Sequence, residues 1–243
     1  MVDLLDEVLA ASGGVSIWHE LQAVSARIDY GGPFWERRGH PGFVGSTHVD
    51  AWVHAERIRH HHEATGLVSE FDKSADRITV TNRAGGTQVL DHPRHSLNEA
   101  TWIEMPWSAA QMAYFRGYAT WHYLVEPFVF TLPGVETCES EPWNENGATW
   151  RVLSVTYPCW IDTHNAIQKY YFDTAFHLRR IDYQPEVLGF APTAHYILKE
   201  KIVDGIIVPT ARSVHLRNAD GSAKSDFAVI TLDISQIKFI RTE

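Results

Sequence analysis

The residues best suited to chemistry lie on one predicted helix, around His122. Tyr118 precedes His122 by four residues and Glu126 follows it by four, so the three side chains share adjoining surface of a helix. A carboxylate one turn away orients an imidazole and raises its basicity, as a general acid/base requires. The structural alternative is a buried histidine held by Glu126 or by a backbone carbonyl. That alternative is favoured, because buried polar groups normally find partners.

Two further histidines could join such a site. His195 and Tyr196 are neighbours on a predicted strand, so only one of them faces the concave side of the sheet. His164 lies in a predicted turn before a strand, where it could reach over the mouth of a cavity; local hydrogen bonds of an ordinary turn are the alternative. We take His195 as a supporting catalytic candidate, and Tyr196 and His164 as candidate ligand contacts.

A histidine-rich segment raises a metal hypothesis. On a strand His60 and His62 point one way and His61 the other, and His48 and His54 share the parity of His60 if no bulge intervenes. The segment lacks the fixed spacing of established zinc motifs, and its charged neighbours suit a solvated face equally well. We predict no metal ligand, and leave a metal site here as the weakest hypothesis.

The sequence offers no recognisable set for nucleophilic catalysis or for cofactor binding. Neither a Ser-His-Asp nor a Cys-His set can be assigned. Gly85-Gly86 joins two alternating segments as a hairpin turn, whereas a phosphate-binding loop starts a helix. We therefore expect no nucleotide, nicotinamide or other cofactor.

The helix that carries His122 is predicted over residues 107–126, between Pro106 and Pro127. It has too little polar surface to lie in water, so either protein or a bound apolar molecule covers it. Core packing is the alternative for any single ring, because large aromatic side chains are usually buried. The aromatic members that we predict to contact a ligand are Trp107, Tyr114, Phe115 and Trp121.

Alternating segments on both sides of this helix predict strands. A hairpin over 77–81 and 87–90 precedes it, and alternating segments separated by turns such as Asn146-Gly147 and Asp204-Gly205 follow it. Such turns indicate an antiparallel meander and not a βαβ fold. We predict an α+β fold of one domain over 1–243, with a helical insertion at about 96–126. Its curved antiparallel sheet forms a half-open β-barrel, and helices fill or cover the concave face.

The chain resembles the lipoprotein-carrier-like half-barrels of the LolA, LppX and VioE type. An N-terminal helix that ends at Gly13-Gly14 before Trp18, a meander interrupted midway by helices, and a late Asp-Gly-Ile-Ile-Val-Pro segment at 204–209 carry the resemblance. It implies a concave apolar face that holds a lipid or an aromatic small molecule. A half-barrel expected in the cytoplasm is closer in location to the VioE type, a cofactor-free enzyme of indole pigment synthesis, than to the periplasmic carriers. The segments 32–35, 114–121, 132–136 and 194–196 are also similar to a group of uncharacterised bacterial proteins.

The amino-acid composition argues against some classes of binding partner. The chain has 243 residues, 44% of them hydrophobic and 21% charged, as in an ordinary folded protein. A net charge of −9 argues against nucleic acid or an anionic membrane surface. No segment is apolar enough for a membrane span, and the acidic N-terminus is unlike a secretory signal. We expect a cytoplasmic protein, and the sequence leaves open a homo-oligomer.

Two functional hypotheses follow. The first is binding of a lipophilic or aromatic small molecule in a cavity between the curved sheet and the 107–126 helix. The alternative is a cofactor-independent lyase, isomerase or cyclase in that cavity, with His122 as general acid/base and Glu126, Tyr118 and His195 in support. Binding needs only an apolar pocket, whereas catalysis needs convergent titratable groups with shifted pKa values.

Overall fold

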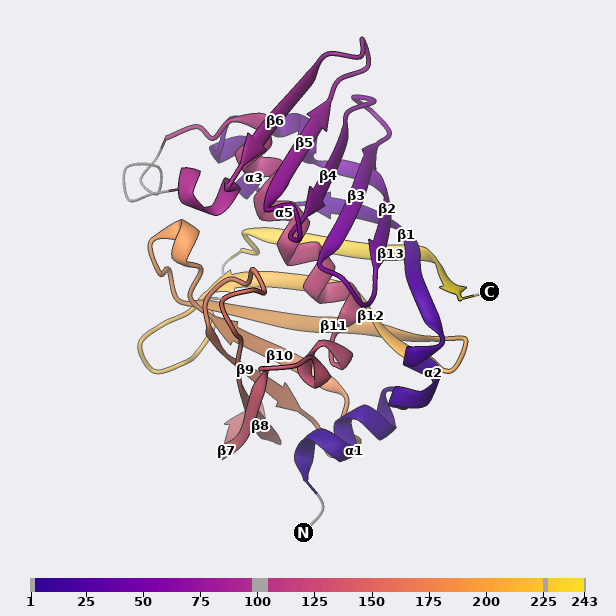
Figure 1. Ribbon diagram of the computed structural model, residues 1–243. Coiled ribbons are helices and arrows are strands. Elements are labelled where there is room, and N and C mark those ends of the chain that lie inside the picture. Colours follow the sequence, from indigo (N-terminus) through magenta and orange to yellow (C-terminus); the bar gives the residue numbers. More distant parts are fainter. Residues whose placement is uncertain (1–2, 98–104, 225–226, 243) are drawn as a thin grey trace.

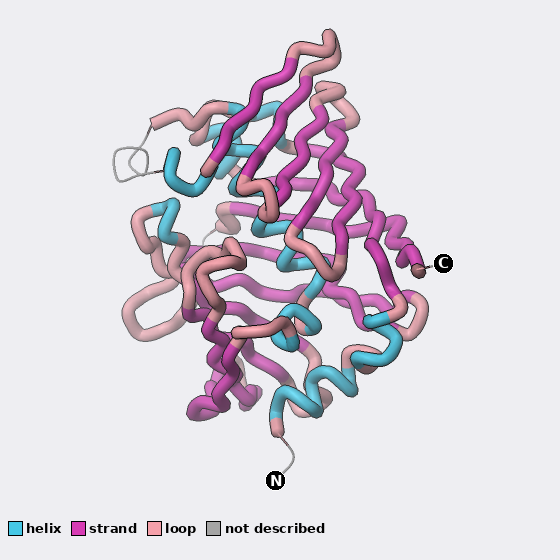
Figure 2. The backbone as a smooth tube through the Cα atoms, viewed as in Figure 1, coloured by secondary structure: helices cyan, strands magenta, loops and turns pink. Residues whose placement is uncertain are grey.

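A long, curved antiparallel sheet wraps around one central helix (Figures 1 and 2). The computed structural model describes residues 3–97, 105–224 and 227–242. Within these residues the sheet has thirteen strands, with β6 at one edge and β7 at the other. The predicted half-open α+β barrel is confirmed.

Within the described residues, the first half of the chain contributes six strands and three short helices before the central helix. The helices are α1 (Leu4–Ala11), α2 (Val15–His19) and α3 (Phe34–Arg37). The strands are β1 (Leu21–Gly31), β2 (Gly45–Trp52), β3 (Arg57–His62), β4 (Val68–Asp72), β5 (Arg77–Thr81) and β6 (Thr87–Asp91). The short 3-10 helices are η1 (Pro41–Phe43) and η2 (Pro93–Ser96). Residues 98–104 of the helical insertion expected at about 96–126 lie outside the described residues.

The second half begins with the central helix α5 (Ala109–Val125) and returns through seven strands. The strands are β7 (Glu136–Glu145), β8 (Ala148–Thr156), β9 (Ile167–Phe172), β10 (Leu178–Tyr183), β11 (Thr193–Val203), β12 (Ile206–Leu216) and β13 (Ile230–Arg241). The 3-10 helices η3 (Phe128–Thr131) and η4 (Glu186–Leu188) lie between them.

The two meanders join where β1 pairs with β13. Strands β1 to β6 step away from this seam in one direction, and β12 to β7 step away in the other. Ile28 faces Ile234 in the register of the seam. The predicted meander is therefore correct within each half. The pairing of the N-terminal and C-terminal strands makes the two halves one sheet.

Local sequence sets both ends of α5. The Ser108 side chain accepts a hydrogen bond from the Gln111 backbone N–H, and the Gln111 side chain accepts one from the Ser108 N–H. This reciprocal pair is a capping box, which satisfies backbone donors at a helix start. The helix ends at Val125, ahead of Pro127, because proline cannot continue the hydrogen-bond ladder.

Burial of α5 is nearly complete, and a glycine permits its close approach to the sheet. All of its residues except Ala109 and Gln111 are buried. A Cβ at Gly117 would lie 3.1 Å from Cβ of Phe71 on β4 and 3.6 Å from Ile58 on β3. The helix therefore packs directly on β3, β4 and β5, and protein covers most of its surface.

The histidines that were expected to share one face of the sheet with His60 and His62 of β3 do not all lie on that face. His60 and His62 are buried, and Val49 and Thr47 of β2 are their cross-strand partners. His48 instead pairs with His61, and both are exposed. The parity prediction for His48 is wrong, because a turn at 53–56 separates β2 from β3. Over the described residues no group of three His, Cys, Asp or Glu side chains is placed to hold a metal ion.

Candidate functional site

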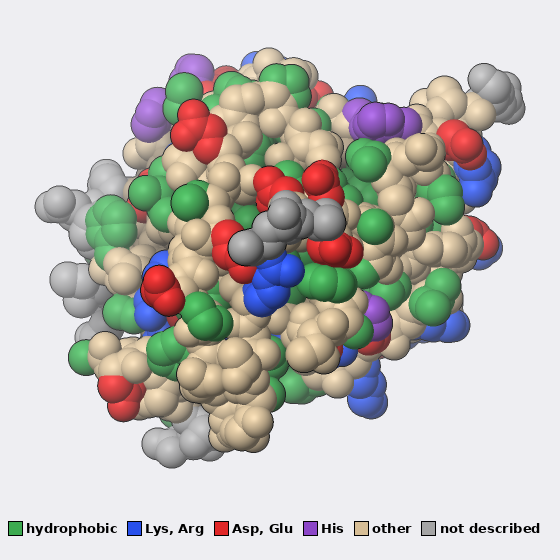
Figure 3. Space-filling model, turned by 90° about the horizontal axis from the view of Figure 1, so that it is seen from below, with side chains coloured by type: hydrophobic (Ala, Val, Ile, Leu, Met, Phe, Trp, Pro, Cys, Tyr) green, Lys and Arg blue, Asp and Glu red, His purple; other side chains and the backbone are tan. Residues whose placement is uncertain are grey.

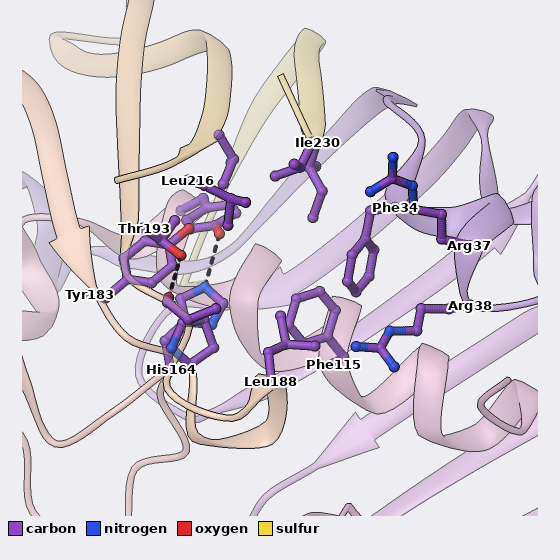
Figure 4. Close-up of a pocket in the computed structure, with 15 residues that line it drawn as sticks. Phe34, Arg37, Arg38, Phe115, His164, Tyr183, Leu188, Thr193, Leu216 and Ile230 are labelled. Atoms are coloured by element: carbon purple, nitrogen blue, oxygen red, sulfur yellow. Dashed lines mark hydrogen bonds between the residues drawn. The ribbon is translucent and has the colours of Figure 1, made fainter. Parts of the chain in front are cut away.

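A pocket of about 680 Å³ lies between α3, the central helix α5 and one end of the sheet (Figure 4). This volume falls within the range of about 300–1,000 Å³ usual for small-molecule sites. Its lining residues are Phe34, Arg37, Arg38, Phe115, Tyr123, His164, Tyr183, Pro185, Leu188, Ala191, Thr193, Val214, Leu216, Val229 and Ile230.

Four consecutive strands contribute to the pocket from the same end. Tyr183 ends β10 and is the register partner of Thr193, which begins β11. Thr193 in turn pairs with Leu216 at the end of β12, and Ile230 begins β13 beside Val214. Antiparallel order places the end of one strand beside the start of the next. The pocket therefore lies at one end of the barrel, where these strands begin or end.

The middle of the pocket is apolar and aromatic. Figure 4 shows Phe34 from α3, Phe115 from α5 and Leu188 from η4 pointing into the same space. The Phe34 and Phe115 rings lie 5.0 Å apart. Such a surface favours an apolar or aromatic ligand, because burying it removes hydrocarbon from water on both partners.

His164 forms a polar end of the pocket, together with tyrosine side chains. Its Nδ1 lies 3.1 Å from the Tyr118 hydroxyl and its Nε2 lies 3.1 Å from the Tyr123 hydroxyl. The His164 ring also stacks on Tyr183, with centroids 4.1 Å apart. These contacts fix the ring in position and orientation.

The electrostatics of this end keep His164 neutral. Burial lowers the pKa of its imidazole well below the usual value, and His122 and Arg94 lower the pKa further. A neutral imidazole has one N–H donor and one acceptor nitrogen. One of the two phenols therefore donates to the ring and the other accepts from it. Burial also raises the pKa values of the Tyr118 and Tyr123 hydroxyls, so both remain protonated near neutral pH.

His195 lies behind this end and not in the pocket wall. Its Nδ1 is 3.4 Å from the Tyr183 hydroxyl, and its ring meets the Tyr123 ring edge-on at 4.8 Å. It is fully buried, and its Nε2 has no hydrogen-bond partner in the described part of the chain. Burial, with Arg212 nearby, lowers the pKa of this histidine well below its usual value.

His122 and Glu126 do not form the pair that their spacing suggests. The Nε2–H of His122 donates to the backbone carbonyl of Asp162 at 3.0 Å. Glu126 forms a buried ion pair with Arg212 of β12, at 3.3 Å. His122 is 5% exposed and is not among the residues that line the pocket. A backbone carbonyl therefore holds its Nε2–H, whereas its Nδ1 is buried with no hydrogen-bond partner among the described residues.

Of the predicted ligand contacts, Phe115 and His164 line the pocket. Trp107 packs behind it, against Phe34 and Phe115. The Tyr114 hydroxyl donates to Asp162.

Two other predicted contacts lie elsewhere. The Trp121 Nε1–H donates to the Trp52 carbonyl at 2.8 Å. Tyr196 lies on the opposite face of the sheet from its neighbour His195, where its hydroxyl donates to Glu145 at 2.6 Å and its ring packs on Arg180. Trp121 is thus bound to a backbone group of the sheet, and Tyr196 belongs to a separate polar cluster.

Sequence reasoning missed the remaining aromatic and the basic residues of the lining, which are Phe34, Arg37, Arg38, Tyr123 and Tyr183. Phe34 belongs to the segment 32–35, already noted for its similarity to other proteins. The other four carry no local signal, because the pocket forms only when α3, α5 and β10 meet.

Comparison with solved structures agrees with this architecture. A LolA superfamily protein from Nitrosomonas europaea aligns over 100% of this chain and 96% of its own length, at 11% identity and a TM-score of 0.57. A DUF1329 family protein from Desulfovibrio piger aligns over 97% of this chain and 91% of its own, at 10% identity and a TM-score of 0.52.

No family model and no curated protein matches the sequence. In the described residues, no helix has the length and apolar character needed to cross a membrane. At such low identities the similarity concerns the fold, and it agrees with the resemblance carried by the sequence. The chain has a half-barrel fold similar to that of the LolA superfamily protein from Nitrosomonas europaea.

Proposed function

We propose that this protein binds a lipophilic or aromatic small molecule in the pocket between α3, α5 and strands β10 to β13. The observation that carries the proposal is the 680 Å³ pocket, whose middle is formed by Phe34, Phe115 and Leu188. The half-barrel fold supports the proposal, because such folds enclose a cavity where side chains do not fill them.

The pocket lies between one end of the curved sheet, the central helix and α3. Two ends of different chemistry flank its apolar middle: Arg37 and Arg38 at one, His164 and Tyr183 at the other (Figure 4). A few polar groups around an apolar centre are typical of sites that orient a small ligand.

The alternative is a cofactor-independent lyase, isomerase or cyclase in the same pocket. One observation favours it: His164 is a neutral imidazole at the pocket wall, linked to the hydroxyls of Tyr118 and Tyr123. In such an enzyme His164 would take the acid/base role predicted for His122. Both ring nitrogens of His164 already bond phenols, so a substrate would have to displace one of them.

Filling the pocket tests the binding proposal. Leu188→Trp adds a large side chain at a residue that points into the pocket, and Leu198→Trp makes the same change at a residue of β11 that is 62% exposed. The titrant is the neutral fluorescent probe N-phenyl-1-naphthylamine. We expect the wild type and Leu198→Trp to bind it equally, and Leu188→Trp to bind it at least tenfold more weakly. Equal binding by all three proteins would overturn the proposal.

A further inference from the structure

We propose that the ligand of this pocket presents an uncharged hydrogen-bond donor, such as a hydroxyl group, to Thr193 and Tyr183. The inference rests on the proposed function and adds the chemical class of the ligand. The ligand's apolar body would lie along Phe115 and Leu188, with its donor at the end of the pocket nearest His164.

This end of the pocket is polar and screened from water. Its polar side chains are those of Tyr123, His164, Tyr183 and Thr193, each between 4% and 7% exposed. Figure 4 shows His164, Tyr183 and Thr193 together at one side of the apolar middle. A polar ligand group that enters such a place gives up its bonds to water, so it binds well only where the protein offers the complementary group. The protons at this end therefore decide what the ligand must carry.

Thr193 has already used its proton. Its hydroxyl donates to the backbone carbonyl of Ala191 at 2.9 Å. A hydroxyl has a single proton to donate but two lone pairs. Toward the pocket, Thr193 therefore acts as an acceptor. It is the register partner of Tyr183, so the two side chains lie on the same face of the sheet.

Tyr183 belongs to a chain of hydroxyl and imidazole groups. Its hydroxyl lies 3.4 Å from Nδ1 of His195 and interacts with the Tyr123 hydroxyl. The Tyr123 hydroxyl in turn lies 3.1 Å from Nε2 of His164. Hydrogen bonds of a chain strengthen one another when they all run in one direction. In either direction, each phenol inside the chain gives its one proton to the next group and keeps a lone pair for the pocket.

The imidazole at this end has committed its proton as well. His164 has one N–H in its neutral form, and both ring nitrogens already bond phenols at 3.1 Å. Burial raises the pKa of the Tyr183 hydroxyl well above its usual value, so this hydroxyl keeps its proton near neutral pH. Lone pairs of the protein therefore face the ligand. An O–H or N–H group is the complement of such a surface, whereas a carbonyl or nitrile of the ligand would meet lone pairs with lone pairs.

Three biphenyls of similar size test the inference. The hydroxyl compound, para-hydroxybiphenyl, carries a donor. The cyano compound, para-cyanobiphenyl, carries an acceptor alone, and the methyl compound, para-methylbiphenyl, carries neither. Each would compete with N-phenyl-1-naphthylamine at neutral pH, where the phenol is uncharged.

The surface of the protein is less suited to these ligands than the pocket. The hydrophobic side chains on the face in Figure 3 are dispersed among polar and charged ones. The pocket instead gathers Phe34, Phe115 and Leu188 around one space. Because a ligand ring gains most where it meets several apolar side chains at once, we expect the biphenyls to bind in the pocket.

The proteins are wild type, Thr193→Val, Tyr183→Phe, the double variant and Thr131→Val. Thr193→Val keeps the shape of the side chain and removes its oxygen, and Tyr183→Phe removes only the phenol oxygen. Thr131→Val is the matched control. The Thr131 hydroxyl also donates to a backbone carbonyl, that of Phe128 at 2.8 Å, and Thr131 is not among the residues that line the pocket.

We expect wild type to bind the hydroxyl compound roughly tenfold more tightly than the methyl compound, as one buried hydrogen bond would give. The cyano compound should bind no more tightly than the methyl compound. Thr193→Val and Tyr183→Phe should each lose part of the preference for the hydroxyl, and the double variant nearly all of it. Thr131→Val should keep the preference, and binding of the methyl compound should change little among the five proteins.

Equal binding of the hydroxyl and methyl compounds to wild type, or tightest binding of the cyano compound, would overturn the inference and leave the proposed function standing. So would a hydroxyl preference that survives in the double variant. The comparison of the three ligands in wild type needs no substitution, so it decides the inference even if a variant folds poorly. Failure of all three biphenyls and of the probe itself would overturn the proposed function as well.

Discussion

His164 stacks on Tyr183 with ring planes 17° from parallel. The two residues come from different segments of the chain. They meet because hydrogen bonds join the loop after β8, which carries His164, to the end of β10. The Glu186 backbone N–H donates to the His164 carbonyl at 2.8 Å, and the Gln184 N–H donates to the Asn165 side chain at 2.9 Å. These two hydrogen bonds hold the neutral imidazole of His164 at the wall of the pocket.

Removing one phenol from His164 should destabilise the protein. Tyr123→Phe leaves Nε2 of a buried imidazole without its partner, and a buried unsatisfied group costs about 1–3 kcal/mol. Tyr196→Phe is the control, because its hydroxyl is only part-buried and bonds Glu145, outside the His164 network. Urea unfolding measures both variants. A loss in Tyr123→Phe no larger than that in Tyr196→Phe would contradict the assigned network.

The Glu126–Arg212 pair should give stability an unusual pH dependence. Burial raises the pKa of the Glu126 carboxyl from 4.5 to about 7, against the opposing effect of Arg212. Between these two values the folded state keeps a proton that the unfolded state releases, so this contribution to stability falls as pH rises. Glu126→Gln should therefore be more harmful relative to wild type at pH 5 than at pH 8.

Urea unfolding at the two pH values gives this difference. Glu139→Gln serves as the control, because Glu139 lies on β7 in an exposed pair with Arg151. Identical losses for Glu126→Gln at pH 5 and pH 8 would rule out a raised pKa for Glu126.

His122 should act in the opposite sense. Burial lowers the pKa of its imidazole from 6.5 to about 4, although the bond to the Asp162 carbonyl raises it in part. In that window the unfolded state binds a proton that the folded state does not, so stability is lost as pH falls from 6.5 toward 4. His122→Gln should lessen this acid sensitivity, whereas the same change at the exposed His48 should not. An unchanged pH profile in His122→Gln would refute the prediction.

The close packing of the central helix should tolerate no larger side chain at Gly117. Even a single Cβ added at Gly117 would lie only 3.1 Å from the Cβ of Phe71. Gly117→Val should cost about 1–3 kcal/mol or more, because extra carbons in a packed core force backbone shifts. Ala109→Val, at the first residue of α5 and outside its buried set, is the control for valine in the helix. Equal unfolding free energies in the two variants would show that the helix does not pack closely on β4.

Local patterns predicted most of the elements and the fold class. The helix predicted over 107–126 agrees with α5 (Ala109–Val125) to within two residues at each end, because Pro106 and Pro127 are local signals. The strands after Pro133 follow from alternation and turn residues. The β1–β13 seam could not be predicted, because it pairs the N-terminal and C-terminal halves of the chain. Strand β4 was missed because it is short and its polar and apolar residues alternate weakly.

The site was predictable only in part. Phe115 and His164 could be selected by residue type and position, and both line the pocket. The helical spacing of His122 and Glu126 predicted that the two side chains bond each other. Instead, His122 bonds the Asp162 carbonyl and Glu126 pairs with Arg212. Helical spacing brings two side chains within reach of each other, but tertiary contacts decide whether they bond.

The most direct test of the central claim is where a neutral ligand binds. The wild-type protein would be photolysed with a neutral alkyl diazirine, digested, and the modified residues mapped by mass spectrometry. We predict adducts on the pocket lining, at Phe115, Leu188, Val214 or Leu216, and their loss in Leu188→Trp. Adducts confined to the exposed apolar residues Leu198 and Ile202, with none in the pocket, would contradict the account.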